Sequence, residues 1–147
     1  MSLPEPGADR PTALPFLAAL AIIVIVVIAI GLVNLFTDGE LTPKQQIARA
    51  AVAQNDALQK ENYADFRSTT CREQQGTEAE VIAGQRDSKE NQGARRVDDV
   101  TDVVIDGERA TAKVTYTFDN EPDAKTEVET TFVREDGAWK VCTPVPS

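Results

Sequence analysis

Two cysteines, Cys71 and Cys142, are the residues whose chemistry is easiest to assign in this sequence. The chain has no histidine and no pair of cysteines spaced as metal ligands. Well-separated cysteines of this kind are typical of a structural disulfide formed in an oxidising compartment. A bridge between them would close a loop of ~70 residues and stabilise the fold by about 4 kcal/mol. A redox-active pair is the alternative, but such pairs normally have an exposed thiol of low pKa and a close spacing.

The absence of histidine also limits catalysis. It removes the commonest general base and metal ligand, and it excludes acyl transfer by a Ser-His or Cys-His pair. Tyr63, Asp65, Asp102 and Tyr116 are the remaining acid or base candidates. Tyr116 alternates with apolar positions and Asp65 falls on an expected polar helix surface, so structural roles are favoured. We therefore expect no catalytic residue and no cofactor.

Two acidic clusters raise the question of a calcium site. The first comprises Asp98, Asp99 and Asp102, and the second has the D-x-E-x-D spacing of Asp119, Glu121 and Asp123. The second cluster lacks the glycine at position six and the glutamate at position twelve of an EF-hand loop. We expect no metal site here, and we interpret both clusters as solvated strand edges and turns, where charge discourages aggregation.

Aromatic residues are few, at 5% of the chain. They could line a ligand pocket, but a small domain needs most of its aromatic side chains in its core. The candidates for pocket or core lining are Phe66, Tyr116, Phe118, Phe132 and Trp139.

An uncharged apolar run over 16–36 indicates where in the cell the protein is located. As a helix it would extend ~31 Å, about the hydrocarbon thickness of a bilayer. A cleavable signal peptide has a shorter apolar core and a small-residue cleavage site, and a buried helix of this length would have a polar face. We therefore expect a single transmembrane helix over 16–36, after a disordered proline-rich tail over 1–15 and before a linker over 37–41.

The orientation of this helix is not settled by flanking charge. Arg10 lies on the N-terminal side and Lys44 and Arg49 on the other, which leans against an external C-terminal domain. The two cysteines favour the opposite arrangement, with the N-terminus cytoplasmic and the domain extracytoplasmic. From Asp38 onward the chain has 22 acidic and 14 basic residues, a net charge of −8. This charge disfavours nucleic acid and anionic lipid headgroups as partners.

The remaining residues predict one α+β domain. Thr42 and Pro43 begin a helix that continues to about Gln59, and two shorter helices are expected over 63–73 and 77–85, before a polar loop. Hydrophobic residues then recur with a period of two, typical of strands with one buried face. The expected strands cover 97–105, 110–118, 126–132 and 139–142, with Asp106-Gly107 and Asp136-Gly137 as hairpin turns and 119–124 as a loop.

This order of elements, together with the segment LQKENYADFRSTTC and the ending DGAWKVC, resembles the cystatin-like, or nuclear-transport-factor-2-like, α+β cone. The chain is similar in particular to small actinobacterial envelope proteins that carry this domain behind an N-terminal membrane anchor. The resemblance covers residues 42–144 and implies a pocket between the long helix and the concave sheet. It implies no single function, because one fold hosts many.

Three hypotheses about function follow. The first is a membrane-tethered, non-enzymatic module that contacts another envelope or membrane protein. The second is a small-molecule or lipid binder that uses the cone pocket beside the membrane. The third, least favoured, is an enzyme of the isomerase or dehydratase type.

Overall fold

The computed structural model describes residues 14–37 and 40–146. The chain divides into two compact units, Met1–Glu40 and Leu41–Ser147. Each unit has its own architecture, and the second contains both cysteines.

The first unit contains helix α1, Leu14–Thr37. From Leu14 to Val33 it is long and apolar enough to cross a bilayer, and none of that segment is buried. The helix begins two residues before the predicted span and ends one residue after it. Leu14 and Pro15 of the predicted tail therefore belong to the helix, and so does Thr37 of the predicted linker. The rest of that tail, 1–13, and the linker residues 38–39 lie outside the described residues.

The second unit begins with helix α2, Pro43–Gln59, as predicted. The Thr42 side chain accepts a hydrogen bond from the backbone N–H of Gln45, and the Gln45 side chain accepts one from the backbone N–H of Thr42. This capping box satisfies two backbone donors, and proline at the first helical position fits the same start. The buried face of α2 includes three alanines, Ala50, Ala51 and Ala57, which allow the helix to lie close to its neighbours.

The second predicted helix, over 63–73, is wrong in its extent. Helix α3, Tyr63–Thr69, ends early, and a short 3₁₀ helix, η1, covers Arg72–Gln74. Thr70 between them is extended and forms an isolated parallel bridge with Val141. Pairing with a strand requires extended backbone, so tertiary contact ends this helix before Cys71.

The third helix was predicted too short. Helix α4, Glu78–Gln92, includes most of the polar stretch that was expected to be a loop. The stretch has little apolar periodicity because α4 packs mainly on α2 and α3 and buries few side chains. The helix ends at Gly93, whose φ of 84° and ψ of −176° lie in a region that is essentially restricted to glycine.

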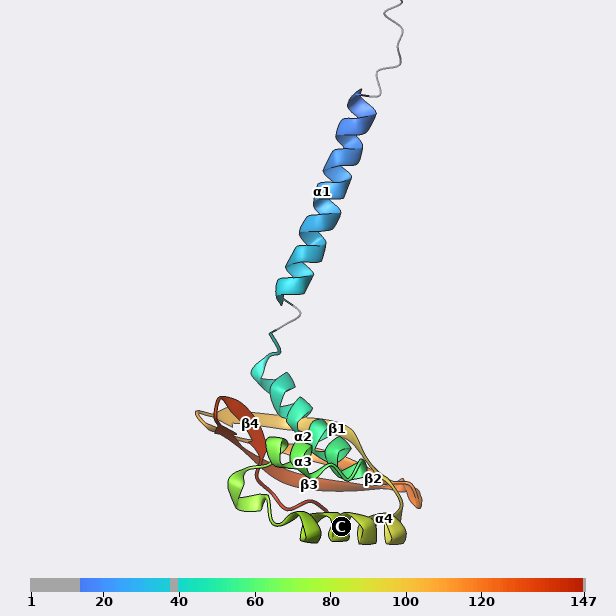
Figure 1. Ribbon diagram of the computed structural model, residues 1–147, viewed down its shortest axis with the longest axis vertical. Coiled ribbons are helices and arrows are strands. Elements are labelled where there is room, and N and C mark those ends of the chain that lie inside the picture. Colours follow the sequence, from blue (N-terminus) through green and yellow to red (C-terminus); the bar gives the residue numbers. More distant parts are fainter. Residues whose placement is uncertain (1–13, 38–39, 147) are drawn as a thin grey trace, which may run out of the picture. The chain divides into compact units, whose positions relative to one another are not determined.

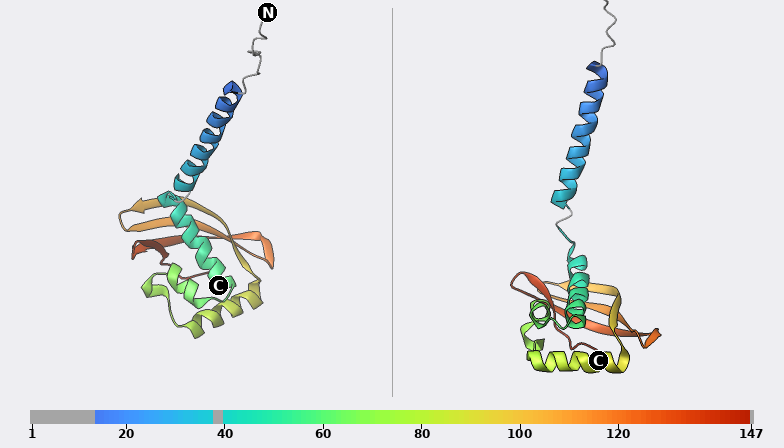
Figure 2. Two further views of the ribbon diagram at one scale, coloured as in Figure 1. Left: turned by 45° about the horizontal axis from the view of Figure 1, so that its top comes forward. Right: turned by 45° about the vertical axis from the view of Figure 1, so that its right-hand side comes forward.

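Four antiparallel strands follow in the order β1-β2-β3-β4, as predicted. They are β1 (Arg95–Asp106), β2 (Arg109–Phe118), β3 (Glu121–Glu135) and β4 (Ala138–Val141). The predicted loop over 119–124 is wrong, because Asp119 and Asn120 alone make the turn and β3 begins at Glu121. Pro122 is tolerated there because β4 pairs only with the far end of β3, which leaves this part of β3 at a sheet edge. Figures 1 and 2 show α2 crossing one face of the curved sheet.

The main hydrophobic core lies between α2 and the sheet, and we call it the cone core. Its members come from α2 and from strands β2, β3 and β4, and all are at most 7% exposed. Short alanine side chains on both α2 and β2 bring the helix close, and larger side chains fill the remaining space. The cone core comprises Ile47, Ala50, Ala51, Ala110, Ala112, Val114, Tyr116, Phe132, Trp139 and Val141.

Candidate functional site

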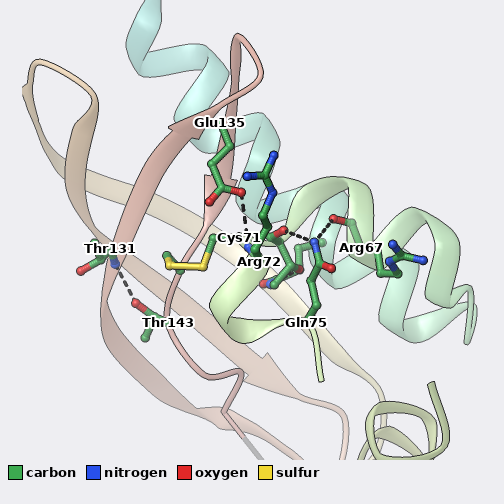
Figure 3. The surroundings of a disulfide bond; sticks show 10 residues. Arg67, Cys71, Arg72, Gln75, Thr131, Glu135 and Thr143 are labelled. Carbon is green, nitrogen blue, oxygen red and sulfur yellow. Dashed lines mark hydrogen bonds between the residues drawn. A yellow bond between two sulfur atoms is a disulfide. The ribbon is translucent and has the colours of Figure 1, made fainter. Parts of the chain in front are cut away.

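Cys71 and Cys142 form a disulfide, with their Cα atoms 5.2 Å apart. Cys71 is fully buried, and its backbone N–H donates to the Val141 carbonyl at 2.9 Å. The Cys142 backbone N–H donates to the Thr131 carbonyl at 2.8 Å. The bond therefore joins the segment after α3 to the end of β4 (Figure 3). Its burial and backbone pairing are those of a structural crosslink.

Polar contacts surround this disulfide. The Arg72 backbone N–H donates to a carboxylate oxygen of Glu135 at 3.3 Å, and the Thr131 N–H donates to the Thr143 hydroxyl at 2.8 Å. Gln75 Nε2 donates to the carbonyls of Arg67 and Thr70 (Figure 3). These contacts hold the chain on both sides of the bond.

The acid and base candidates are not brought together. The Tyr63 hydroxyl donates to the Gly76 carbonyl at 2.5 Å. Asp65 takes part in the N-terminal cap of α3 with Asn62. Asp102 lies at an irregularity of β1, with a φ of 54° and its carboxylate 3.8 Å from Lys113 Nζ. Each of these side chains is occupied by a local structural contact.

The two acidic clusters also remain dispersed. Among the residues that the structure describes, no group of three His, Cys, Asp or Glu side chains is arranged to hold a metal ion. Asp98 accepts a hydrogen bond from Thr117 and lies 4.0 Å from Lys125, and Asp119 lies 3.7 Å from Arg96. Their charges are thus paired across strands and turns.

Most of the aromatic candidates lie in the core. Tyr116, Phe132 and Trp139 belong to the cone core, and Phe118 is 6% exposed. Phe66 packs in a smaller cluster with Ala57 and Leu58. Of the five, only Phe66 is among the residues that line the pocket described next.

One pocket, whose lining includes several apolar side chains, has a volume of about 270 Å³ and lies beside the cone core. We call it the Arg95 pocket. Its walls come from α2, α3, η1, α4, the start of β1 and the segment after β4. The lining residues are Leu58, Phe66, Gln74, Glu80, Val81, Gly84, Gln85, Ser88, Arg95, Pro144, Val145 and Pro146.

Arg95 is the unusual member of this lining, because it is only 3% exposed. Its Nε donates to Asn55 Oδ1 at 2.8 Å, and its Nη1 donates to the Pro146 carbonyl at 2.7 Å. The guanidinium lies over the Tyr116 ring, 5.7 Å from its centroid. Burial lowers the pKa of Arg95 to about 10, an effect that Tyr116 partly offsets. The side chain therefore carries its positive charge at neutral pH.

The sequence reasoning missed Arg95. Its signal was present, because Arg95 precedes Val97 by two residues and so belongs to the inward face of β1. Neighbouring Arg96 is exposed, as the alternation requires. An arginine at the first residue of a strand was easily assigned to the preceding polar loop.

Comparisons with known proteins agree with this architecture. Residues 73–143 match the family model described as low molecular weight antigen MTB12, C-terminal domain. No curated protein sequence matches the chain. A crystal structure from Nostoc punctiforme, of a protein of unknown function with a cystatin-like fold, is 19% identical with a TM-score of 0.50, covering 69% of this chain and 89% of that one.

Two further solved structures are similar at lower scores. One, from Campylobacter jejuni and provisionally described as an NTF2-like transpeptidase, is 16% identical with a TM-score of 0.46, covering 63% of this chain and 94% of the other. A de novo designed protein with a curved β-sheet is 14% identical with a TM-score of 0.41, covering 64% and 92%. The similarity to the Nostoc structure defines the class of the protein as an α+β chain with a cystatin-like fold, preceded in the sequence by an apolar helix. The fold resemblance expected from the sequence is confirmed.

Proposed function

We propose that this protein is a single-pass, membrane-tethered accessory module of the cell envelope. In this proposal α1 anchors the chain, the N-terminus is cytoplasmic, and the second unit acts outside the membrane by contacting another envelope or membrane protein. The module has no catalytic activity of its own.

One combination of observations carries the proposal. An apolar helix, of which the segment Leu14–Val33 is not buried by the rest of the protein, precedes a separate compact unit. That unit contains a disulfide whose Cys71 is fully buried. A helix of this kind fits either an anchor or a signal peptide, and disulfides persist in oxidising compartments. The match to a domain of the MTB12 antigen family also fits an accessory extracytoplasmic domain.

The residues that line the Arg95 pocket support the proposal that this module is not an enzyme. None of the acid or base candidates Tyr63, Asp65, Asp102 and Tyr116 is among its described lining residues. Glu80 does line it, but this carboxylate is exposed and accepts hydrogen bonds from Thr77. A general acid or base at a reaction site normally has a pKa tuned towards the working pH by burial.

Topology can be tested on full-length protein in native membranes. A membrane-impermeant amine-reactive reagent is applied to sealed cells, and the protein is then analysed without reduction by mass spectrometry. We expect label on exposed lysines of the second unit such as Lys60 and Lys125, a peptide pair joined through Cys71 and Cys142, and a chain intact from its N-terminal segment. Free thiols without reduction, or a mature chain lacking residues 16–36, would contradict the tethered topology.

The accessory role needs a separate measurement. Full-length protein is extracted in mild detergent after crosslinking in living cells, and the crosslinked residues are mapped. We expect one envelope or membrane protein to be joined reproducibly through residues of the second unit. Crosslinks to many unrelated proteins in proportion to their abundance would count against a specific module.

A further inference from the structure

Arg95 is a buried cation without a carboxylate partner among the described residues. Its two hydrogen-bond acceptors, Asn55 Oδ1 and the Pro146 carbonyl, are both neutral. Removing a charged group from water costs several kcal/mol, so buried charges are normally paired with an opposite charge. The Tyr116 ring face offsets part of this cost, because a cation over an aromatic ring is attracted by its quadrupole.

The hydrogen bonds of Nε and Nη1 leave the third nitrogen of this guanidinium to be considered. Arg95 Nη2 is buried and has no hydrogen-bond partner among the described residues. Most buried polar atoms in proteins have a partner, so each exception needs an explanation. Arg95 also lines the pocket that bears its name. An anionic acceptor that enters this pocket and displaces the atoms that cover Nη2 would give this nitrogen a hydrogen-bond partner and offset the charge of the guanidinium.

The rest of the pocket is suited to apolar groups. Leu58 and Phe66 come from α2 and α3, Val81 from α4, and Pro144 and Val145 from the segment after β4. The carboxylate of Glu80 accepts hydrogen bonds from Thr77 in the N-terminal cap of α4 and is not a hydrogen-bond partner of Arg95. The pocket therefore combines apolar walls with one cationic donor, which is the usual composition of a site for an amphiphilic small molecule.

We propose that the Arg95 pocket binds a small organic acid. The carboxylate lies against the Arg95 guanidinium and reaches the covered Nη2 after a local shift of the side chains around it. The apolar part of the molecule contacts the walls contributed by α4 and the segment after β4. A volume of about 270 Å³ corresponds to roughly nine water molecules at about 30 Å³ each. The ligand is thus a short-chain or single-ring carboxylate. This site does not depend on the proposed tether or on a protein partner.

The test uses full-length protein in lipid nanodiscs, because detergent monomers would compete for an apolar pocket. Hexanoate is the probe and hexanamide, its neutral isostere, is the matched ligand control. A ligand-observed NMR titration measures both dissociation constants. We expect saturable binding of hexanoate and binding of hexanamide that is weaker by about tenfold or more, because hydrogen bonds between charged groups are the stronger ones.

Two leucine variants test whether the ligand binds in the pocket, and both leave Arg95 unchanged. Gly84 lines the pocket, and a Cβ built there meets nothing within 4 Å, so the backbone of α4 at this position accepts a side chain. Gly84→Leu therefore adds a side chain at the pocket wall. Ala83→Leu adds the same side chain at the adjacent exposed position of α4, which does not line the pocket. We expect Gly84→Leu to weaken hexanoate binding by about tenfold or more, and Ala83→Leu to leave it unchanged.

Substitution of Arg95 then tests the charge. In Arg95→Met, hexanoate should lose its advantage over hexanamide, and far-ultraviolet circular dichroism must show that the variant is folded before its result is used. If Arg95→Met does not fold, the leucine pair and the amide comparison decide the question. Equal affinity for hexanoate and hexanamide, no saturable binding at millimolar concentrations, or unchanged binding in Gly84→Leu would each overturn the proposal. Because the experiment uses purified protein, its failure would leave the membrane topology and partner measurements unaffected.

Discussion

The cone core and the Arg95 pocket lie in the same unit but are built from different side chains. In the cone core, α2 presents Ile47, Ala50 and Ala51 to a sheet face that carries complementary apolar residues. At the Arg95 pocket, α4 presents Val81, Gly84, Gln85 and Ser88, of which only Val81 is a large apolar residue. A helix with small apolar side chains closes tightly on a sheet, whereas a helix with a polar, glycine-containing face leaves space against its neighbours.

This difference bears on function. Protein interiors are close-packed, and voids larger than a water molecule are few in any one domain. The space between α2 and the sheet is filled by the side chains of the cone core, and the Arg95 pocket lies among the helices of the unit. We therefore expect stability to depend mainly on the cone core and ligand selectivity on the Arg95 pocket.

The largest expected effect comes from the cone core. Phe132 is fully buried, and Phe132→Ala should lower the free energy of unfolding by about 3–5 kcal/mol, because it removes apolar contacts and leaves a cavity. Phe66→Ala is the matched control at the pocket, where space is already open. Phe66→Ala should lower the free energy of unfolding by about 2 kcal/mol, which is the free energy of transferring the lost apolar atoms from water, with no added cost for a new cavity. Trp139, the only tryptophan of the chain, reports urea unfolding of the full-length protein in detergent by its fluorescence. Equal losses in the two variants would show that the two regions are packed alike.

The disulfide should produce the next largest effect. Replacing Cys71 and Cys142 together by serine should lower the free energy of unfolding by about 2–5 kcal/mol, since the unfolded chain gains conformational freedom. The loss should be uneven, because the bond holds the α3 and η1 side to β4. Hydrogen exchange should accelerate first in Tyr63–Thr69 and only later in the paired centre of β2 and β3. Uniform acceleration would mean that the pocket side and the cone core open as one unit.

Gly93→Ala tests the connection between the two regions. Gly93 lies between α4 and β1, and a Cβ there would approach the backbone nitrogen of Asn120 to 3.0 Å. Its backbone conformation also belongs to a region that costs other residues about 1–3 kcal/mol. We expect a loss of stability within that range and weaker hexanoate binding, because Arg95 follows two residues later. Gly107→Ala is the control, since it also has positive φ but meets nothing within 4 Å. Loss of stability with unchanged hexanoate binding would show that the position of α4 does not influence the pocket.

Much of this architecture was predictable because local rules decide it. The capping box at Thr42 and the Asp136-Gly137 turn depend on neighbouring residues alone, and both were predicted. The turn predicted at Asp106-Gly107 lies one residue later, because Asp106 still pairs with Arg109. The predicted alternation of β2 holds only as far as Val114, because Thr115 and Thr117 of the expected exposed face are buried. The elements that were wrong depend on distant contacts. Thr70 is extended because it pairs with Val141, and the polar C-terminal part of α4 gives no apolar period to detect.

The candidate site was less predictable for the same physical reason. Cys71 and Cys142 were paired correctly because the chain offers no other cysteine. Arg95 was not identified, because its burial results from Asn55, Tyr116 and the Pro146 carbonyl, which come from three separate parts of the chain. Sequence shows the inward face of a strand, but it does not show which other segments will close over it.

The smallest expected effect concerns the start of α4, where the Arg95 pocket meets solvent. Hydrogen bonds from the Thr77 side chain and backbone lower the pKa of Glu80, and the exposed position limits the energy involved. Because the folded pKa is below the unfolded value, this contribution is present above pH 4.5 and is lost as the pH falls through the folded pKa. Glu80→Gln keeps the shape of the capping side chain and removes its charge. The stability difference between wild type and Glu80→Gln should therefore be present at pH 7 and shrink as the protein is acidified, measured by Trp139 fluorescence at each pH. Glu78→Gln, in the same turn but outside the capping box, controls for the helix dipole. A pH dependence as large in Glu78→Gln would assign the effect to the dipole, and the edge of the pocket would then have no specific polar contact of its own.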